Sequence, residues 1–163
     1  MVNLASWNIR GLNRSLKQKE VQKFVKGNNL QVIAILESHV QVENLDGVCK
    51  KVFRNWEWTS NGSLCNKGTR VILGWNVDNV DVLVVHATNQ VVHVQIHFKK
   101  DKTMINVSFV YASNSDQERK QLWDSLRMHK RVVHDSPWII MGDFNVALSL
   151  DDKCMGSSDV NAA

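Results

Sequence analysis

The chain has 163 residues, is 44% apolar with a single proline, and carries a formal net charge of +4. These values predict one folded domain and exclude a disordered chain. The sequence has no run of about 18 apolar residues, so we expect no membrane span. It shows no secretory signal, so we expect an intracellular protein, nuclear or cytoplasmic. Cys49, Cys65 and Cys154 are odd in number and form no Cys-x-x-Cys pair, which favours a reducing compartment and excludes a cysteine zinc site.

The first predicted elements are a strand and a helix. Residues 2–7 alternate between apolar and small or polar side chains, which predicts a strand that ends at Asn8. Ser15 and Gln18 match a capping box for the helix that follows, and Gly27 ends it. The lysines on the other faces of this helix are interpreted as solvated: Lys17, Lys19, Lys23 and Lys26.

The next stretch contains an apolar run followed by an acid. Residues 31–36 are apolar after the first position, and the run stops at Glu37. A short run of this kind predicts a strand buried on both faces, with the acid at its C-terminal end. Residues 38–55 show no clear pattern, and residues 56–59 resemble a short strand.

Residues 69–111 predict an antiparallel meander. Its four strands are residues 69–75, 80–85, 91–98 and 103–110. In the third strand, His93 and His97 alternate with apolar residues. Because residues four apart on a strand are separated by about 13 Å, these histidines cannot share one metal ion, and we interpret both as part of a solvated face. Tyr111 and Asn114 follow the last strand.

A second helix and a last strand complete the pattern. Ser115 and Glu118 match another capping box, ahead of an apolar stripe at helical spacing. Residues 138–141 form a second short apolar run, predicted to be a strand buried on both faces, and lead into Gly-Asp-Phe-Asn. Asp143 and Asn145 would point to the same side in extended geometry. A turn is the alternative, since Gly, Asp and Asn are all turn formers.

Four polar residues therefore follow predicted strands: Asn8, Glu37, Asp143 and Asn145. If these strands are neighbours in one sheet, the polar side chains converge at its rim. An acid that holds a divalent ion, a second acid that orients water and nearby amides describe metal-assisted hydrolysis of a phosphate ester. Hard oxygen ligands favour Mg²⁺ over zinc, with Mn²⁺ as an alternative.

The charge is unevenly spread along the chain. Residues 1–75 hold 11 Lys/Arg and 5 Asp/Glu, which gives +6, whereas residues 76–163 hold 9 and 11, which gives −2. A basic half beside an acid-bearing half suits a polyanion bound over a metal or acid site. An ordinary distribution of surface charge is the alternative.

Four segments resemble the endonuclease/exonuclease/phosphatase superfamily, and most of all the endonuclease domain of plant LINE-type (non-LTR) retrotransposons. They are residues 6–12, 36–38, 110–114 and 142–145. The resemblance implies a single domain over residues 1–163, built as a four-layer α/β sandwich of two packed, mainly antiparallel sheets flanked by helices. It also implies Mg²⁺-dependent nicking of DNA and, in the parent element, a fused reverse transcriptase that the nick would prime.

The same resemblance implies the role of each site residue. Glu37 resembles the metal ligand and Asp143 the residue that activates water. Tyr111 resembles the tyrosine near the scissile phosphate, with packing at a strand end as its alternative. Asn8 and Asn145 resemble the amides that tie the catalytic network together, and Asn114 resembles the asparagine that contacts the DNA backbone. Arg10 and Asn8 are also predicted to bind the substrate.

The sequence departs from the family pattern in two places. Arg10 stands where many members have a further acid, and the family domain continues well past Asn145 to an Asp-His pair that has no match here. We therefore expect the first two-thirds of the domain, incomplete at its C-terminus, marginally stable and slow at nicking. The alternatives are a catalytically impaired remnant that only binds nucleic acid, and a phosphoesterase acting on a phosphoinositide or other small phosphoester.

Overall fold

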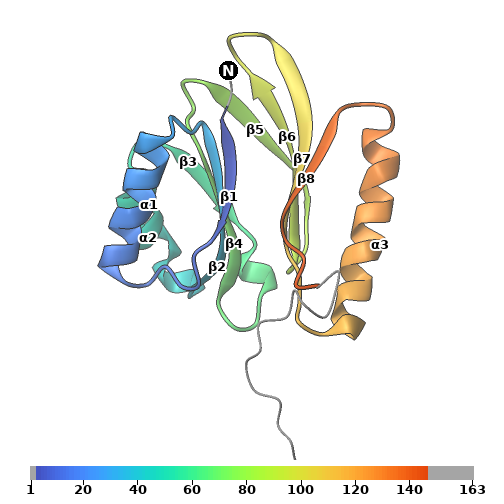
Figure 1. Ribbon diagram of the computed structural model, residues 1–163, viewed down its shortest axis with the longest axis horizontal. Coiled ribbons are helices and arrows are strands. Elements are labelled where there is room, and N and C mark those ends of the chain that lie inside the picture. Colours follow the sequence, from blue (N-terminus) through green and yellow to red (C-terminus); the bar gives the residue numbers. More distant parts are fainter. Residues whose placement is uncertain (1–2, 147–163) are drawn as a thin grey trace, which may run out of the picture.

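Two four-stranded sheets pack face to face in the computed structural model, which describes residues 3–146 (Figure 1). The first sheet, in the order β1-β2-β4-β3, contains β1 (Leu4–Asn8), β2 (Val32–Val40), β3 (Glu57–Ser60) and β4 (Thr69–Trp75). The second, in the order β5-β6-β7-β8, contains β5 (Val80–Ala87), β6 (Val91–Phe98), β7 (Thr103–Tyr111) and β8 (Trp138–Asp143). Cys154 lies outside the described residues.

Helices cover the outer face of each sheet. The helices α1 (Ser15–Gly27) and α2 (Leu45–Phe53) lie outside the first sheet, and α3 (Asp116–Val133) lies outside the second (Figure 1). Short 3₁₀ turns occupy Val42–Asn44 and Gly62–Leu64. The strand pairs β1–β2 and β7–β8 are parallel, and the other pairs are antiparallel. The predicted four-layer sandwich is therefore confirmed. None of these helices is long and apolar enough to span a membrane.

The central strands bury side chains on both faces. Between the sheets most of the buried residues come from β2, β4, β6 and β7, among them Val32, Ala34, Leu36, Val71, Leu73, Val92, Val94, Ile96, Val107 and Phe109. On the other face of β2, Ile33 and Ile35 pack with buried residues of α1 and α2. The apolar run of β2 thus lies in two cores, as predicted, and each such side chain contributes about 1.5–3 kcal/mol when fully buried.

One helix was missed and one capping box was predicted wrongly. The missed helix α2 buries Leu45, Cys49, Val52 and Phe53, whose spacing of i, i+4, i+7 and i+8 is helical. Gln18 does not cap α1; its side-chain amide donates to the Leu12 carbonyl at 3.0 Å. The second capping box forms in half, since Ser115 Oγ accepts from the Glu118 N–H.

The prediction that β8 is buried on both faces is wrong for the described residues. Here β8 is the edge strand of the second sheet, and Ile139 and Ile140 are 43% and 40% exposed. The physical reason is that β8 pairs only with β7, and no strand within residues 3–146 pairs with its other edge.

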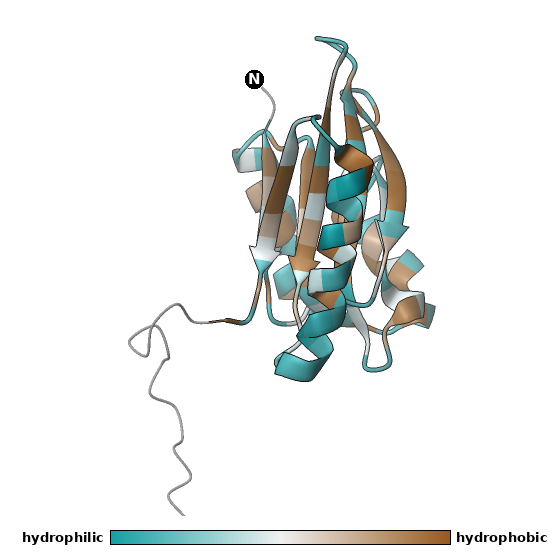
Figure 2. Cartoon of the chain, turned by 90° about the vertical axis from the view of Figure 1, so that its right-hand side faces the viewer, coloured by the Kyte–Doolittle hydropathy of each residue, from teal (hydrophilic) through white to brown (hydrophobic). Residues whose placement is uncertain are grey.

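His93 is buried, not solvated as predicted, whereas His97 is exposed. Figure 2 shows α3 lying along this face of the second sheet with its hydrophilic side outward. The His93 ring nitrogens lie 2.6 Å from Ser108 Oγ and 3.0 Å from Ser125 Oγ, and its ring stacks on His129 at 4.0 Å between centroids. The polar face of β6 is therefore covered at His93, which bonds to Ser125 of α3, and open to water at His97.

The first prediction concerns Gly142, which has φ of +142°. A Cβ atom there would lie 2.0 Å from the carbonyl oxygen of Val110, its partner on β7. We expect Gly142→Ala to lower the free energy of unfolding by about 2–4 kcal/mol in a urea titration, because β7 and β8 must separate or the backbone must stay strained.

The matched control is Gly47→Ala in α2, where an added Cβ meets no atom within 4 Å. This change should raise the free energy of unfolding by about 0.5–1 kcal/mol, the helix preference for Ala over Gly. Equal stability of the Gly142 variant and the unchanged chain would contradict the contact with Val110.

The second prediction concerns pH. Burial, followed by His129 and His86, lowers the pKa of His93 to about 3, against 6.5 for an unperturbed histidine. Between these values the unfolded chain binds the proton and the folded chain does not, so stability is complete above about pH 6.5 and falls as the pH is lowered, by up to about 1.4 kcal/mol per unit.

Urea midpoints measured from pH 7 to pH 4 would test this dependence. His93→Gln should reduce the slope of stability against pH, and His97→Gln, at an exposed position of the same strand, should leave it unchanged. A slope that persists in full in the His93 variant would show that this imidazole is not the group responsible.

Candidate active site

The C-terminal ends of β1 and β8 meet where the two sheets pack together. The side-chain amide of Asn8, the last residue of β1, donates to Asp143 Oδ2 at 2.8 Å. The two strands belong to different sheets, so Asn8 and Asp143 do not follow neighbouring strands of one sheet. The polar groups converge because the sandwich brings two sheet edges together.

Asn145 holds the other oxygen of Asp143. Its backbone N–H donates to Asp143 Oδ1 at 2.9 Å, and its side-chain amide donates to the Ala112 carbonyl at 2.6 Å. Asn145 has φ of +48°, a conformation that Asn adopts more readily than most residues. Each oxygen of the Asp143 carboxylate thus accepts a bond from a fixed donor, which sets the plane of the group.

Glu37 lies in an irregular part of β2. The strand does not stop at Glu37, as predicted, but continues to Val40, and its register with β4 shifts between Leu36 and Val40. The N–H of Gly11 donates to the Glu37 carbonyl at 2.8 Å, so the loop after β1 bonds to this irregular segment. The Glu37 side chain is 23% exposed, and its Oε1 lies 3.3 Å from His39 Nε2.

Tyr111 lies near the Glu37 and Asp143 carboxylates. It is the last residue of β7 and is paired with Asp143 across the parallel β7–β8 register. Burial and then the Glu37 and Asp143 carboxylates raise the pKa of Tyr111 above its ordinary value, while a hydrogen bond with Asn145 opposes the shift. Its hydroxyl therefore lies near both acids and stays protonated at neutral pH.

Two predicted substrate-binding residues lie at the periphery of this group. Arg10 is exposed, and its backbone N–H donates to Asn8 Oδ1 at 3.2 Å, which fixes the amide that bonds to Asp143. Asn114 is exposed in the loop between β7 and α3, and within residues 3–146 no hydrogen bond joins it to the other site residues. The structure thus brings together Asn8, Glu37, Tyr111, Asp143 and Asn145, whose catalytic roles stay predictions.

His39 was missed by sequence reasoning. Its position two residues after Glu37 on the same strand could have indicated it, since such side chains share a face in regular geometry. It also has a positive φ, as do Arg10, Glu37 and Asn145. Backbone strain of this kind costs about 1–3 kcal/mol per residue and is found more often at functional sites than elsewhere.

The donor atoms at this rim are those that Mg²⁺ uses. Mg²⁺ is usually held by one or two carboxylates and keeps several waters, and Glu37 and Asp143 supply carboxylates with amide oxygens close by. In the described part of the chain, no group of three or more His, Cys, Asp or Glu could hold a metal ion. The residues therefore fit a partly hydrated Mg²⁺ or Mn²⁺ and do not fit a closed zinc site.

Two acids with amides at the rim of a four-layer α/β sandwich suit metal-assisted hydrolysis of a phosphate ester. The chain belongs to the Endonuclease/Exonuclease/phosphatase family, whose model matches residues 5–159. Members of this family are typically hydrolases that use divalent metal ions, and they act as nucleases or phosphatases. No curated protein matches the sequence significantly.

Solved structures share this fold. The endonuclease domain of TRAS1, a telomere-specific non-LTR retrotransposon, is 16% identical with a TM-score of 0.69 over 90% of this chain and 60% of its own. A mannosyl-6-phosphatase of Bacteroides thetaiotaomicron is 13% identical, with a TM-score of 0.67 over 90% of this chain and 66% of its own. The AP endonuclease LMAP of Leishmania major is 16% identical, with a TM-score of 0.67 over 93% of this chain and 57% of its own. The chain thus spans less than two-thirds of each structure, and these likenesses show the fold alone.

The third prediction tests the bond between Asn8 and Asp143. Asn8→Asp would put a second carboxylate where a donor now lies 2.8 Å from Asp143 Oδ2. We expect the free energy of unfolding at pH 7 to fall by about 1–3 kcal/mol, because a hydrogen bond becomes a like-charge contact.

The double variant Asn8→Asp with Asp143→Asn provides the control. It exchanges donor and acceptor, so it should recover most of the stability that Asn8→Asp loses. Additive losses in this double-mutant cycle would mean that the two side chains do not interact.

Proposed function

We propose that this domain is a divalent-metal-dependent endonuclease that cuts one strand of DNA, as in LINE-type retrotransposition. The observation that carries the proposal is the Asp143 carboxylate, held at one oxygen by Asn8 and at the other by Asn145, beside Tyr111 and Glu37. The likeness to a retrotransposon endonuclease domain supports it, and a reverse transcriptase fused to the domain would extend the 3′-hydroxyl at the nick.

In this proposal Asp143 takes a proton from the attacking water. A general base must be held at a fixed distance from the proton that it removes, and the two donors on Asp143 provide that orientation. Asn8 is itself fixed by the Arg10 N–H, and Asn145 by the Ala112 carbonyl. The base is thus held in place by backbone groups of the segments that follow β1 and β7.

Glu37 would hold the metal ion. When bound there, Mg²⁺ or Mn²⁺ would neutralise negative charge on the phosphoryl oxygens. Tyr111, kept protonated by its surroundings, would donate a hydrogen bond to a phosphate oxygen. Arg10 and Asn114 are exposed at the periphery and would contact the DNA backbone.

The charge distribution favours DNA over a small phosphoester. Residues 1–75 hold 11 Lys/Arg and 5 Asp/Glu, and a long polyanion interacts with many of these charges at once. A small phosphoester would interact only with the groups at the rim. Binding of DNA should therefore weaken steeply with salt and show little sequence preference.

The fourth prediction is a Mg²⁺-dependent conversion of supercoiled plasmid to the open circle. Asp143→Asn and Glu37→Gln should each slow it by about 10²–10⁴-fold, the usual contribution of a positioned general base or comparable group. The control Asp135→Asn, whose carboxylate is 93% exposed and pairs with His134, should nick at the unchanged rate.

Two further arms separate the alternatives. Mn²⁺ should broaden NMR signals around Glu37 in the unchanged chain and not in Glu37→Gln, which tests the metal ligand without activity. A chain that binds DNA but never nicks it would be the impaired remnant. Faster hydrolysis of a small phosphomonoester than of plasmid would replace DNA as the substrate.

A further inference from the structure

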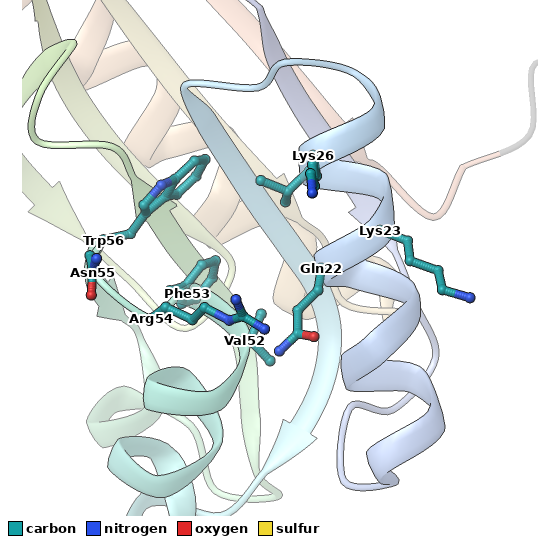
Figure 3. A pocket seen from close by; sticks show the side chains of 9 residues that line it. Gln22, Lys23, Lys26, Val52, Phe53, Arg54, Asn55 and Trp56 are labelled. Carbon is teal, nitrogen blue, oxygen red and sulfur yellow. The ribbon is translucent and has the colours of Figure 1, made fainter.

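A cleft of about 430 Å³ opens between the C-terminal half of α1 and the end of α2 (Figure 3). The cleft lies at the end of the molecule where α1 ends and β2 begins. There the Leu30 N–H bonds to the Val25 carbonyl. The site residues lie at the opposite, C-terminal end of β1 and in the irregular end of β2. Nothing in the proposed nuclease reaction uses this cleft.

Cationic side chains line the cleft. Lys23 and Lys26 come from α1, and Arg54 follows α2 directly. Figure 3 shows the Arg54 guanidinium directed toward Gln22 across the cleft, with Lys26 at one end and Lys23 pointing outward. Within residues 3–146 none of the three forms a salt bridge, although Lys17 and Lys50 on the same helices are paired with acids. The cleft therefore has an uncompensated positive charge.

Its inner wall is aromatic and apolar. The rings of Phe53 and Trp56 stack at 6.2 Å between centroids with 9° between their planes, and Val52 lies beside them. Phe53 is buried and Trp56 is partly exposed. A partly exposed indole backed by a second ring is a flat surface on which a nucleobase can stack.

Amide groups complete the lining. Gln22 donates its side-chain N–H to the Lys51 carbonyl, which leaves its oxygen free to accept, and Asn55 is exposed at the rim. Carboxamides of this kind pair with the polar edges of nucleobases. The volume of the cleft lies within the range of sites that hold one small ligand, so the cleft would hold one nucleotide and not a duplex.

We propose that this cleft binds one nucleotide unit of a single-stranded nucleic acid, with the base against Trp56 and the phosphate between Lys26 and Arg54. Cations alone would suit any polyanion. The aromatic wall can stack on a nucleobase and the amides can pair with its polar edge, whereas an acidic polypeptide has no base to occupy these groups. The lining therefore favours a nucleotide strand. This site is separate from the rim at which duplex DNA would be cut, so the two proposals can fail independently.

The test is fluorescence anisotropy with a labelled decathymidylate in EDTA, so that no cutting occurs. The double variant Lys26→Ala with Arg54→Gly should bind at least tenfold more weakly. Glycine suits position 54 because Arg54 has φ of +55°, so the thermal midpoint should not fall through strain at that position. The matched control is Lys17→Ala with Lys50→Ala, which removes two positive charges from the same helices outside the cleft and should bind within about twofold of the unchanged chain.

Base recognition is tested without changing the protein. A strand of the same length that lacks its bases should bind at least fivefold more weakly than decathymidylate. Equal losses in the two double variants, equal binding of the base-free strand, or equal competition by polyglutamate would each overturn the proposal. Asp143→Asn should slow plasmid nicking and keep decathymidylate binding, which separates the cleft from the candidate active site.

Discussion

The face-to-face packing of the two sheets is the constraint on which the candidate site depends. Asn8 and Asp143 are 135 residues apart in the sequence, and their hydrogen bond exists only when the strands of both sheets share one core. The side chains of β2, β4, β6 and β7 that fill this core have no chemical function of their own. They set the separation of the sheets, and that separation decides whether an amide on one sheet can orient a carboxylate on the other.

The family resemblance predicted the layers, and the residue pattern predicted the polar strand ends. Neither indicates which helix or strand covers each strand. The run 31–36 correctly predicted the first half of β2 and its burial on both faces, because residues buried on both faces need no periodicity. The same reasoning placed residues 138–141 in a buried centre, whereas β8 lies at an edge of the described sheet. His93 was predicted to be solvated because alternation separates two faces of a strand without indicating whether water or a helix lies on the polar one.

The geometry around Glu37 could not be predicted for a different reason. Its backbone conformation is decided by residues distant in sequence, namely the loop after β1 that bonds to its carbonyl and the loop that brings Gly68 against His39. Local propensity favours a regular strand here. Tertiary contacts override it, and the result is a carboxylate near the hydroxyl of Tyr111.

The absence of a side chain at Gly142 also fixes the alignment of β8. A shift of β8 by one residue along β7 would place Met141 or Asp143 opposite Val110, and the carbonyl of Val110 leaves no room for a Cβ in the present arrangement. The same shift would turn Asp143 to the other side of the sheet. Steric conflict with the Val110 carbonyl therefore disfavours shifted pairings of β8 with β7 during folding. The register that remains places the Asp143 carboxylate on the side where Asn8 lies.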